Sequence, residues 1–403
     1  MQLKKSWLAV LASVALASCG GDGDGARYTE LVSFGDSLSD VGSYRTPGIA
    51  ALGGGKYTVN GMADGVWVEQ LAAKLALPTL CAAQTGLLAS GQFASLAGAV
   101  ANHPACSAYG QGGSRVTDPI GPWNAALLQL PNDDARFMGQ LGQLTSPVVD
   151  QIARHLAAHN GRFSGKELVT VLAGANDVFV AADAVAVAVE TAGTQAADAA
   201  FAQALQSGAT PEQAGAAAQE AARAAATQVL QTAGPQSVAA LAQAGAELAA
   251  LIKTQIVAKG ATRVAVLNLP NISKTPATAR AESNAPGAAQ LADAMTLAFN
   301  QALAAGLDGT ADTVVQVNLY AENTDHHANP ARYGLTNTTD PACNNQFPNA
   351  PGFLAPSLIC TTSTLVAGDT SHYLFADEVH PTPFGHSLLR DMTLKALAAK
   401  GWD

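Results

Sequence analysis

The sequence predicts an α/β protein whose parallel sheet is covered by helices on both faces. Of its 403 residues, 48% are hydrophobic and only 13% are charged, which excludes a wholly disordered chain. Three short apolar runs have the length and composition of buried strands, at residues 168–172, 263–269 and 313–319. Segments that favour helices separate these runs, and such alternation is typical of a parallel sheet.

The N-terminal half is expected to contain two strands, two helices and long loops. In order, these are a strand at 27–34, a loop at 43–62, a helix at 66–77, an irregular stretch at 80–135, a helix at 146–158 and the strand at 168–172. Pro78 is expected to end the first helix. Ser146 is expected to cap the second helix, with Pro147 in its first turn.

Alanine dominates residues 181–259, and we expect several helices there rather than disorder because alanine is the strongest helix former. The remaining elements are a strand at 263–269, a helix at 290–306, a strand at 313–319, a mostly irregular stretch at 321–374 and a terminal helix at 383–400.

The N-terminus is typical of an export signal. Lys4 and Lys5 precede an apolar stretch at 7–16, and small residues follow it. Residues 16–19, Leu-Ala-Ser-Cys, resemble the lipobox of bacterial lipoproteins, which implies that Cys19 becomes the lipidated first residue. A plain secretory signal is the alternative.

These features predict a signal peptide at 1–18, a flexible tether at 19–26 and one folded domain at 27–403, with a helical insertion at about 181–259. Gly20 stands where an aspartate would be associated with inner-membrane retention. We therefore expect an exported protein anchored through Cys19 to the outer membrane or cell surface. A periplasmic or extracellular location is the alternative.

Four further cysteines remain, and an exported compartment permits disulfides between them. Four cysteines allow three pairings. The local pairing is expected because each bond closes one loop-like segment, and it joins Cys81 to Cys106 and Cys343 to Cys360.

Nucleic-acid binding and metal binding are not expected. The formal net charge of −10 repels phosphate backbones. No C-x-x-C or H-E-x-x-H spacing occurs, and we expect His326, His327 and His372 to be solvated loop residues rather than metal ligands. His386, on the terminal helix, is expected to pack in the core.

Three polar motifs adjoin predicted strands and the last helix. Residues 35–37, Gly-Asp-Ser, follow the first strand, residues 174–177, Gly-Ala-Asn-Asp, follow the strand at 168–172, and residues 377–380, Asp-Glu-Val-His, precede the last helix. Ligands of parallel sheets bind at the carboxyl ends of the strands. These motifs are therefore candidates for one shared site.

A serine hydroxyl needs a base before it can act as a nucleophile. Ser37 is the candidate nucleophile and His380 the candidate base. Asp377, three residues before His380, could hold its ring and stabilise the imidazolium, and Glu378 is the rival carboxylate.

Donors for an oxyanion are also present. They are the backbone N–H of Ser37, the backbone N–H of Gly113 and the side-chain amide of Asn176. Asn176 could instead only cap a helix, and the choice between Gly112 and Gly113 stays open. Four residues near Ser37 in sequence either line an acyl-binding pocket or pack in the core: Tyr44, Tyr57, Met62 and Trp67.

The motifs at 34–40, 112–113, 174–177 and 377–381 resemble, in order, the four blocks of the GDSL/SGNH hydrolase family, and most closely its bacterial lipase/esterase branch of phospholipase–lecithinase–haemolysin type. The resemblance implies a flavodoxin-like three-layer α/β/α fold with five parallel strands. It implies a triad of Ser37, Asp377 and His380, an oxyanion hole of Ser37, Gly113 and Asn176, carboxylic ester substrates and no cofactor. The second block often begins with Asn, where this chain has Ala108.

The predicted function is that of a serine esterase or lipase that forms an acyl-enzyme. One alternative is a phospholipase or lysophospholipase acting on membrane lipids. Another is an inactive hydrolase scaffold whose alanine-rich region at 181–259 binds a partner protein.

Overall fold

The computed structural model describes residues 28–62, 65–344, 346–347, 350–354 and 356–402. The predicted signal peptide at 1–18, the tether at 19–26 and Cys19 lie outside the described residues. Among the helices within these ranges, none is long and apolar enough to cross a membrane.

A parallel four-stranded sheet forms the centre of the molecule, in the order β1-β4-β5-β6. The strands are β1 (Glu30–Gly35), β4 (Glu167–Leu172), β5 (Val264–Leu267) and β6 (Val314–Val317). All residues of β4 and β5 are buried, which is why the sequence shows them as continuous apolar runs, whereas the edge strand β6 exposes Gln316.

The expectation of five strands was wrong. Beside β1 lies the extended segment 107–111, in the place where a fifth strand would add to the sheet. Ser33 N–H donates to Ser107 O, and Tyr109 N–H donates back to Ser33 O. The pairing is only an isolated bridge, because the segment starts just after the disulfide-bonded Cys106 and ends in the glycine-rich loop at 110–113.

Helices cover both faces of the sheet, so the three-layer α/β/α arrangement is confirmed. Cores form between one face and the four helices α4 (Val148–Ala158), α5 (Ala175–Gln206), α6 (Pro211–Leu251) and α8 (Ala288–Gly306). The other face packs against α2 (Trp67–Lys74) and α10 (Pro383–Ala399). The expected cap at Ser146 was wrong: Pro147 occupies the cap position of α4, and the Ser146 hydroxyl accepts a hydrogen bond from Arg154 rather than from the first turn of the helix.

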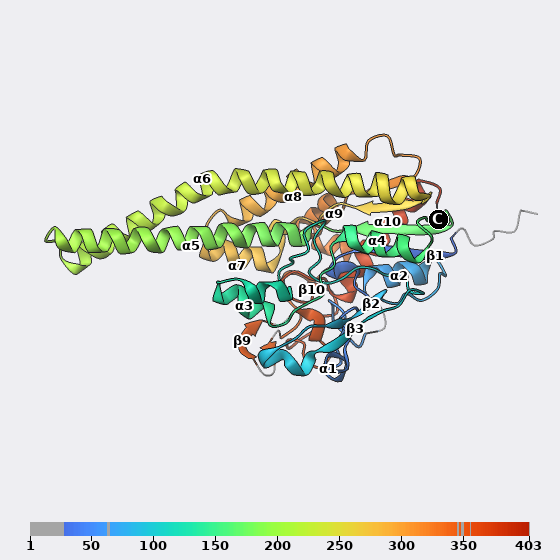
Figure 1. Cartoon of the computed structure of the whole chain (residues 1–403), viewed down its shortest axis with the longest axis horizontal. Coiled ribbons are helices and arrows are strands. Elements are labelled where there is room, and N and C mark those ends of the chain that lie inside the picture. Colours follow the sequence, from blue (N-terminus) through green and yellow to red (C-terminus); the bar gives the residue numbers. More distant parts are fainter. Residues whose placement is uncertain (1–27, 63–64, 345, 348–349, 355, 403) are drawn as a thin grey trace, which may run out of the picture.

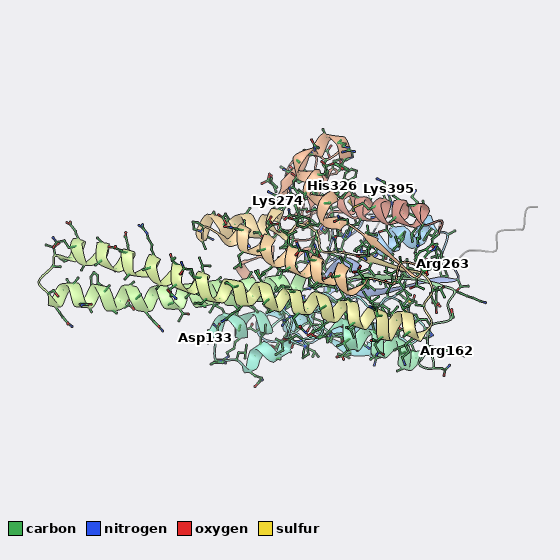
Figure 2. All side chains as sticks on the ribbon, turned by 90° about the horizontal axis from the view of Figure 1, so that it is seen from above. Asp133, Arg162, Arg263, Lys274, His326 and Lys395 are labelled. Carbon is green, nitrogen blue, oxygen red and sulfur yellow. A yellow bond between two sulfur atoms is a disulfide. The ribbon has the colours of Figure 1, made fainter. Side chains whose placement is uncertain are left out.

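The alanine-rich region forms the two long helices α5 and α6, which run side by side and project far beyond the sheet (Figures 1 and 2). Helix α5 begins directly after β4, six residues earlier than the start of the alanine-rich region at residue 181. Asn176 consequently lies in its first turn. Between Val185 and Gly234, Ala214 is the one buried residue among the described positions of this α5–α6 hairpin.

The stretches expected to be irregular contain short elements. Residues 80–135 hold an antiparallel pair and the start of a helix, β2 (Gln84–Leu87), β3 (Gly98–Asn102) and α3 (Asp133–Gly139). Residues 321–374 hold the end of one helix and short strands, α9 (Leu319–Ala328), β7 (Asn337–Pro341), β8 (Gln346–Phe347), β9 (Ala350–Leu354) and the start of β10 (Tyr373–Phe375). Two further helices are α1 (Pro47–Ala51) and α7 (Pro276–Asn284).

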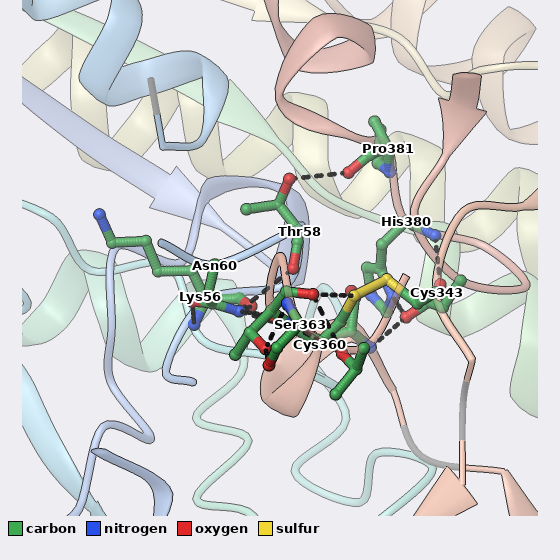
Figure 3. Close-up of a disulfide and its surroundings, with 12 residues drawn as sticks. Lys56, Thr58, Asn60, Cys343, Cys360, Ser363, His380 and Pro381 are labelled. Carbon is green, nitrogen blue, oxygen red and sulfur yellow. Dashed lines mark hydrogen bonds and ion pairs between the residues drawn. A yellow bond between two sulfur atoms is a disulfide. The ribbon is translucent and has the colours of Figure 1, made fainter. Parts of the chain in front are cut away.

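Both disulfides are present with the expected pairing, Cys81–Cys106 and Cys343–Cys360. The first precedes the segment that pairs with β1. The second joins the regions on either side of the short strands β8 and β9 (Figure 3).

Candidate active site

Ser37 lies at the carboxyl end of β1 in a tightly held turn. It begins the 3-10 helix Ser37–Ser39, which Asp36 caps by accepting a hydrogen bond from Leu38 N–H. Gly35 must be glycine, since a Cβ there would lie 2.2 Å from the Leu172 carbonyl oxygen of β4. Gln151 of α4 bonds both the N–H and the carbonyl of Gly35, at 2.9 and 2.8 Å, and thereby fixes the end of the strand.

The structure brings Ser37, His380 and Asp377 into one hydrogen-bonded line. His380 Nε2 lies 2.8 Å from Ser37 Oγ, and His380 Nδ1 lies 2.6 Å from Asp377 Oδ2. All three residues are buried. Glu378, the rival carboxylate, instead forms an ion pair with Arg280 at 2.7 Å. The geometry therefore favours Asp377 as the partner of the imidazole.

Asp377 is held as a carboxylate. Its Oδ1 accepts hydrogen bonds from the N–H groups of Val379 and His380, at 2.9 and 2.7 Å. Its Oδ2 accepts from Ser357 N–H at 2.5 Å in addition to the imidazole. Burial opposes ionisation, but the interaction with His380 and these hydrogen bonds lower the pKa of Asp377 to about 2.

The three candidate oxyanion donors line the same cavity of about 280 Å³ as the Ser37 hydroxyl. Asn176 Nδ2 gives one hydrogen to Ser114 O at 2.9 Å, which leaves its second hydrogen for a ligand. No acceptor for the N–H of Ser37 or Gly113 is found within the part of the chain that the structure describes. Gly112 N–H already donates to Asp40 Oδ2 at 3.0 Å, so the geometry favours Gly113 over Gly112.

Asp40, the last residue of the motif at 34–40, is a further residue near the site, and the sequence alone does not indicate its role. Its buried carboxylate accepts hydrogen bonds from Gly42 N–H, from Ser43 N–H and hydroxyl, and from Gly112 N–H. Burial raises the pKa of Asp40, and these hydrogen bonds limit the rise. Asp40 thus ties the glycine loop to the turn that carries Ser37.

Asp177 has a comparable bracing role. Its carboxylate accepts hydrogen bonds from Arg115 Nε at 3.0 Å and from Val116 N–H at 3.1 Å. These bonds hold the segment after the glycine loop against the start of α5. Neither contact involves the Ser37 hydroxyl.

The cavity lining is largely apolar. It includes Leu38, Trp123, Phe179, Ile272, Leu374 and Phe375. Of the four residues for which pocket lining and core packing were both open, Tyr57 lines this cavity. Its ring lies beside that of His380, with centroids 4.8 Å apart and planes tilted by 36°. The other three do not line it. Tyr44 is buried and its hydroxyl donates to Gly112 O, and Trp67 is buried and its Nε1–H donates to Ser39 Oγ. Met62 is exposed and lines a second cavity.

The expectation that His326 and His327 are solvated loop residues was wrong. Both lie in the last turn of α9, which begins at Leu319 because the Asn318 side chain caps it. Burial lowers the pKa of each to about 4, so both are neutral near pH 7. His326 lines the cavity. His372 lies in an exposed loop and His386 is buried. Within the described ranges, no group of three or more His, Cys, Asp or Glu residues could hold a metal ion.

Asp36→Asn is expected to stabilise the protein at alkaline pH. Burial raises the pKa of Asp36 from 3.8 to about 7, and its Oδ2 has no hydrogen-bond partner among the described residues. The Asp36 carboxyl ionises near pH 4 in the unfolded chain but only near pH 7 in the folded protein. The free energy of unfolding of the wild type therefore falls as the pH rises from about 4 to about 7. Asparagine keeps the cap and cannot ionise.

Chemical denaturation at pH 4 and pH 8 measures this effect. The variant should gain on the order of 2–4 kcal/mol over wild type at pH 8 and little at pH 4. Asp308→Asn, at an exposed position, is the matched control. An equal gain at both pH values would contradict the expectation.

Comparison with known families gives one match that covers most of the chain. A family model described as GDSL-like lipase/acylhydrolase matches residues 31–391, from β1 to α10. A search of curated proteins finds no significant match.

Proposed function

Because the chain belongs to the GDSL-like lipase/acylhydrolase family, we propose that this hydrolase is a serine esterase that cleaves carboxylic esters through Ser37, His380 and Asp377. The observation that carries the proposal is the 2.8 Å contact of His380 Nε2 with Ser37 Oγ, backed by Asp377 on the other ring nitrogen. This is the arrangement that activates a serine hydroxyl.

In the first half of the reaction, Ser37 Oγ attacks the ester carbonyl carbon while His380 Nε2 takes its proton. The oxyanion accepts hydrogen bonds from Ser37 N–H, Gly113 N–H and Asn176 Nδ2. Collapse of this intermediate breaks the bond to the alcohol oxygen, which leaves with the proton from His380. Asp377 stays ionised and stabilises the imidazolium.

In the second half, water attacks the acyl-Ser37 ester while His380 takes one of its protons. The tetrahedral intermediate expels Ser37 Oγ, which recovers a proton from His380, and the carboxylic acid is released. No cofactor takes part in either step.

The apolar lining of the cavity supports an acyl chain as the group bound there. It also supports a second candidate, a phospholipase or lysophospholipase, whose substrates carry apolar acyl chains. The hydrogen-bonded Ser37–His380–Asp377 line counts against an inactive scaffold that only binds a partner protein. The acidic net charge continues to argue against nucleic acid as a partner.

The two disulfides support export of the protein. We propose that cleavage after residue 18 leaves Cys19 as a lipid anchor, that 19–26 is the tether, and that 27–403 is one hydrolase domain carrying the insertion at 181–259. The anchor would place the enzyme at the outer membrane or cell surface. A periplasmic or extracellular enzyme is the alternative.

A fluorophosphonate probe tests the proposal directly. It should label the purified protein at Ser37 alone, and the protein should hydrolyse p-nitrophenyl esters. A series of graded acyl lengths, run beside a lysophospholipid, distinguishes the two substrate classes. Folded protein that neither reacts with the probe at Ser37 nor cleaves any of these esters would contradict the proposed function.

A further inference from the structure

A separate chain segment contacts the carboxylate of Asp377. Ser357 N–H donates to Asp377 Oδ2 at 2.5 Å, the same oxygen that lies 2.6 Å from His380 Nδ1. The other two backbone donors to Asp377 are the N–H groups of Val379 and His380, which belong to its own turn and move with it. Among the described donors to Asp377, Ser357 is thus the one that fixes the carboxylate from outside its own turn.

The Cys343–Cys360 disulfide connects that segment to the strand before Asp377. On one side, Cys360 N–H donates to Ser357 O at 3.0 Å. On the other side, Cys343 N–H donates to Ala376 O at 2.9 Å, immediately before Asp377. Both cysteines are buried in a small cluster with Ala376. The disulfide therefore links the two segments that determine where the Asp377 carboxylate lies.

Asn60 joins the same assembly from the loop after α1. Its Nδ2 donates to Ser357 O at 3.1 Å and to Cys360 O at 3.0 Å, and its backbone N–H donates to Cys360 O at 2.8 Å. Figure 3 shows Asn60 and the disulfide together with the segment of His380 and Pro381. We call Asn60, Cys343, Ser357 and Cys360 the acid brace.

We propose that the acid brace positions Asp377 for catalysis. In this proposal Ser357 N–H fixes the orientation of the Asp377 carboxylate, and the disulfide holds Ser357 in place. The inference rests on the proposed function, since it assigns positioning residues to the same triad. A carboxylate oxygen that receives both an imidazole N–H and a backbone N–H is fixed in its rotation. Small displacements of such a group lower the rate of the chemical step more than they weaken substrate binding.

The Ser357 N–H can be removed without a large change of backbone. Ser357 is the first residue of the 3-10 helix Ser357–Ile359, a position that accepts proline, and the preceding Pro356 is already extended. Ser357→Pro deletes the donor to Asp377. Ser357→Ala keeps that donor and removes only a hydroxyl that has no partner among the described residues.

We expect kcat for a short-chain p-nitrophenyl ester to be at least about tenfold lower in Ser357→Pro than in Ser357→Ala, with KM within about twofold. The thermal unfolding midpoints of the two variants check that both are folded. Equal kcat values in two folded variants would overturn the inference.

The disulfide is tested with the double variant C343S/C360S, compared with C81S/C106S, which loses the other disulfide. Only the first should lower kcat at nearly constant KM. A folded C343S/C360S enzyme with wild-type kcat would remove the disulfide from the proposal. If that variant does not fold, the comparison at Ser357 decides.

A readout that needs no turnover separates this inference from the proposed function. The low-field proton NMR resonance of the His380 Nδ1–H reports its hydrogen bond to Asp377. It should shift in Ser357→Pro and stay near its wild-type position in Ser357→Ala. If the resonance shifts in Ser357→Pro but the wild-type protein has no esterase activity, the positioning role stands and the proposed function is wrong. If the resonance does not shift in Ser357→Pro but the wild-type protein is an active esterase, the proposed function stands and the positioning role is wrong.

Discussion

Ser37→Ala is expected to lower kcat for ester hydrolysis by about 10⁴-fold or more. Alanine removes the oxygen that attacks the carbonyl carbon, so no acyl-enzyme can form. The backbone N–H of residue 37 stays, and with Gly113 and Asn176 it can still stabilise an oxyanion. A small residual rate is therefore expected.

A steady-state assay with a p-nitrophenyl ester and covalent labelling by the fluorophosphonate probe both measure this effect. Ser207→Ala, at the exposed end of α5, is the matched control and should behave like the wild type. A folded Ser37→Ala protein with undiminished activity would show that hydrolysis occurs elsewhere.

Asp377→Asn is expected to lower kcat near neutral pH by about 10³–10⁴-fold. The asparagine amide would donate to Nδ1 of His380 and so leave the proton on Nε2, the nitrogen that must accept a proton from Ser37. Because the pKa of Asp377 is about 2, the wild-type carboxylate is fully ionised across the neutral range. Titration of Asp377 itself should therefore contribute nothing to the pH dependence of kcat between about pH 6 and 9.

Glu378→Gln is the informative comparison, because from the sequence either Asp377 or Glu378 could be the carboxylate that holds the His380 ring. It breaks the ion pair with Arg280 at the cavity and should cost far less than Asp377→Asn. A larger loss of kcat in Glu378→Gln would mean that the assignment of the acid is wrong.

The parallel sheet could be predicted from the sequence because its strands are buried on both faces. Leu168, Val169 and Val171 of β4 are fully buried, and only apolar residues suit such positions. The proximity of the polar motifs followed from the same prediction, since the ends of parallel strands meet at one edge. Ser37 and Asn176 line the same cavity for this reason.

The features that the sequence does not reveal depend on backbone groups or on tertiary contacts. The segment 107–111 bonds β1 through its main chain, and no side-chain pattern reveals that it stops short of a full strand. Ser357 contacts Asp377 through its N–H, which every residue except proline carries. His326 is buried by the tertiary packing of α9, and a histidine in a sequence does not by itself indicate whether its side chain is buried or exposed.

The α5–α6 hairpin has a consequence for how stability is distributed. Its base shares a core with the sheet, through Val178 of α5 and Leu241 and Leu248 of α6. Its outer half has no such core and depends on contacts between two alanine-rich helices. We therefore expect amide protons there to exchange with solvent through local opening, and those around Asn176 to exchange only when the sheet itself unfolds. Hydrogen-exchange measurements should then show the outer half of the hairpin and the body around the sheet as separate cooperative units, although α5 and α6 each run through both.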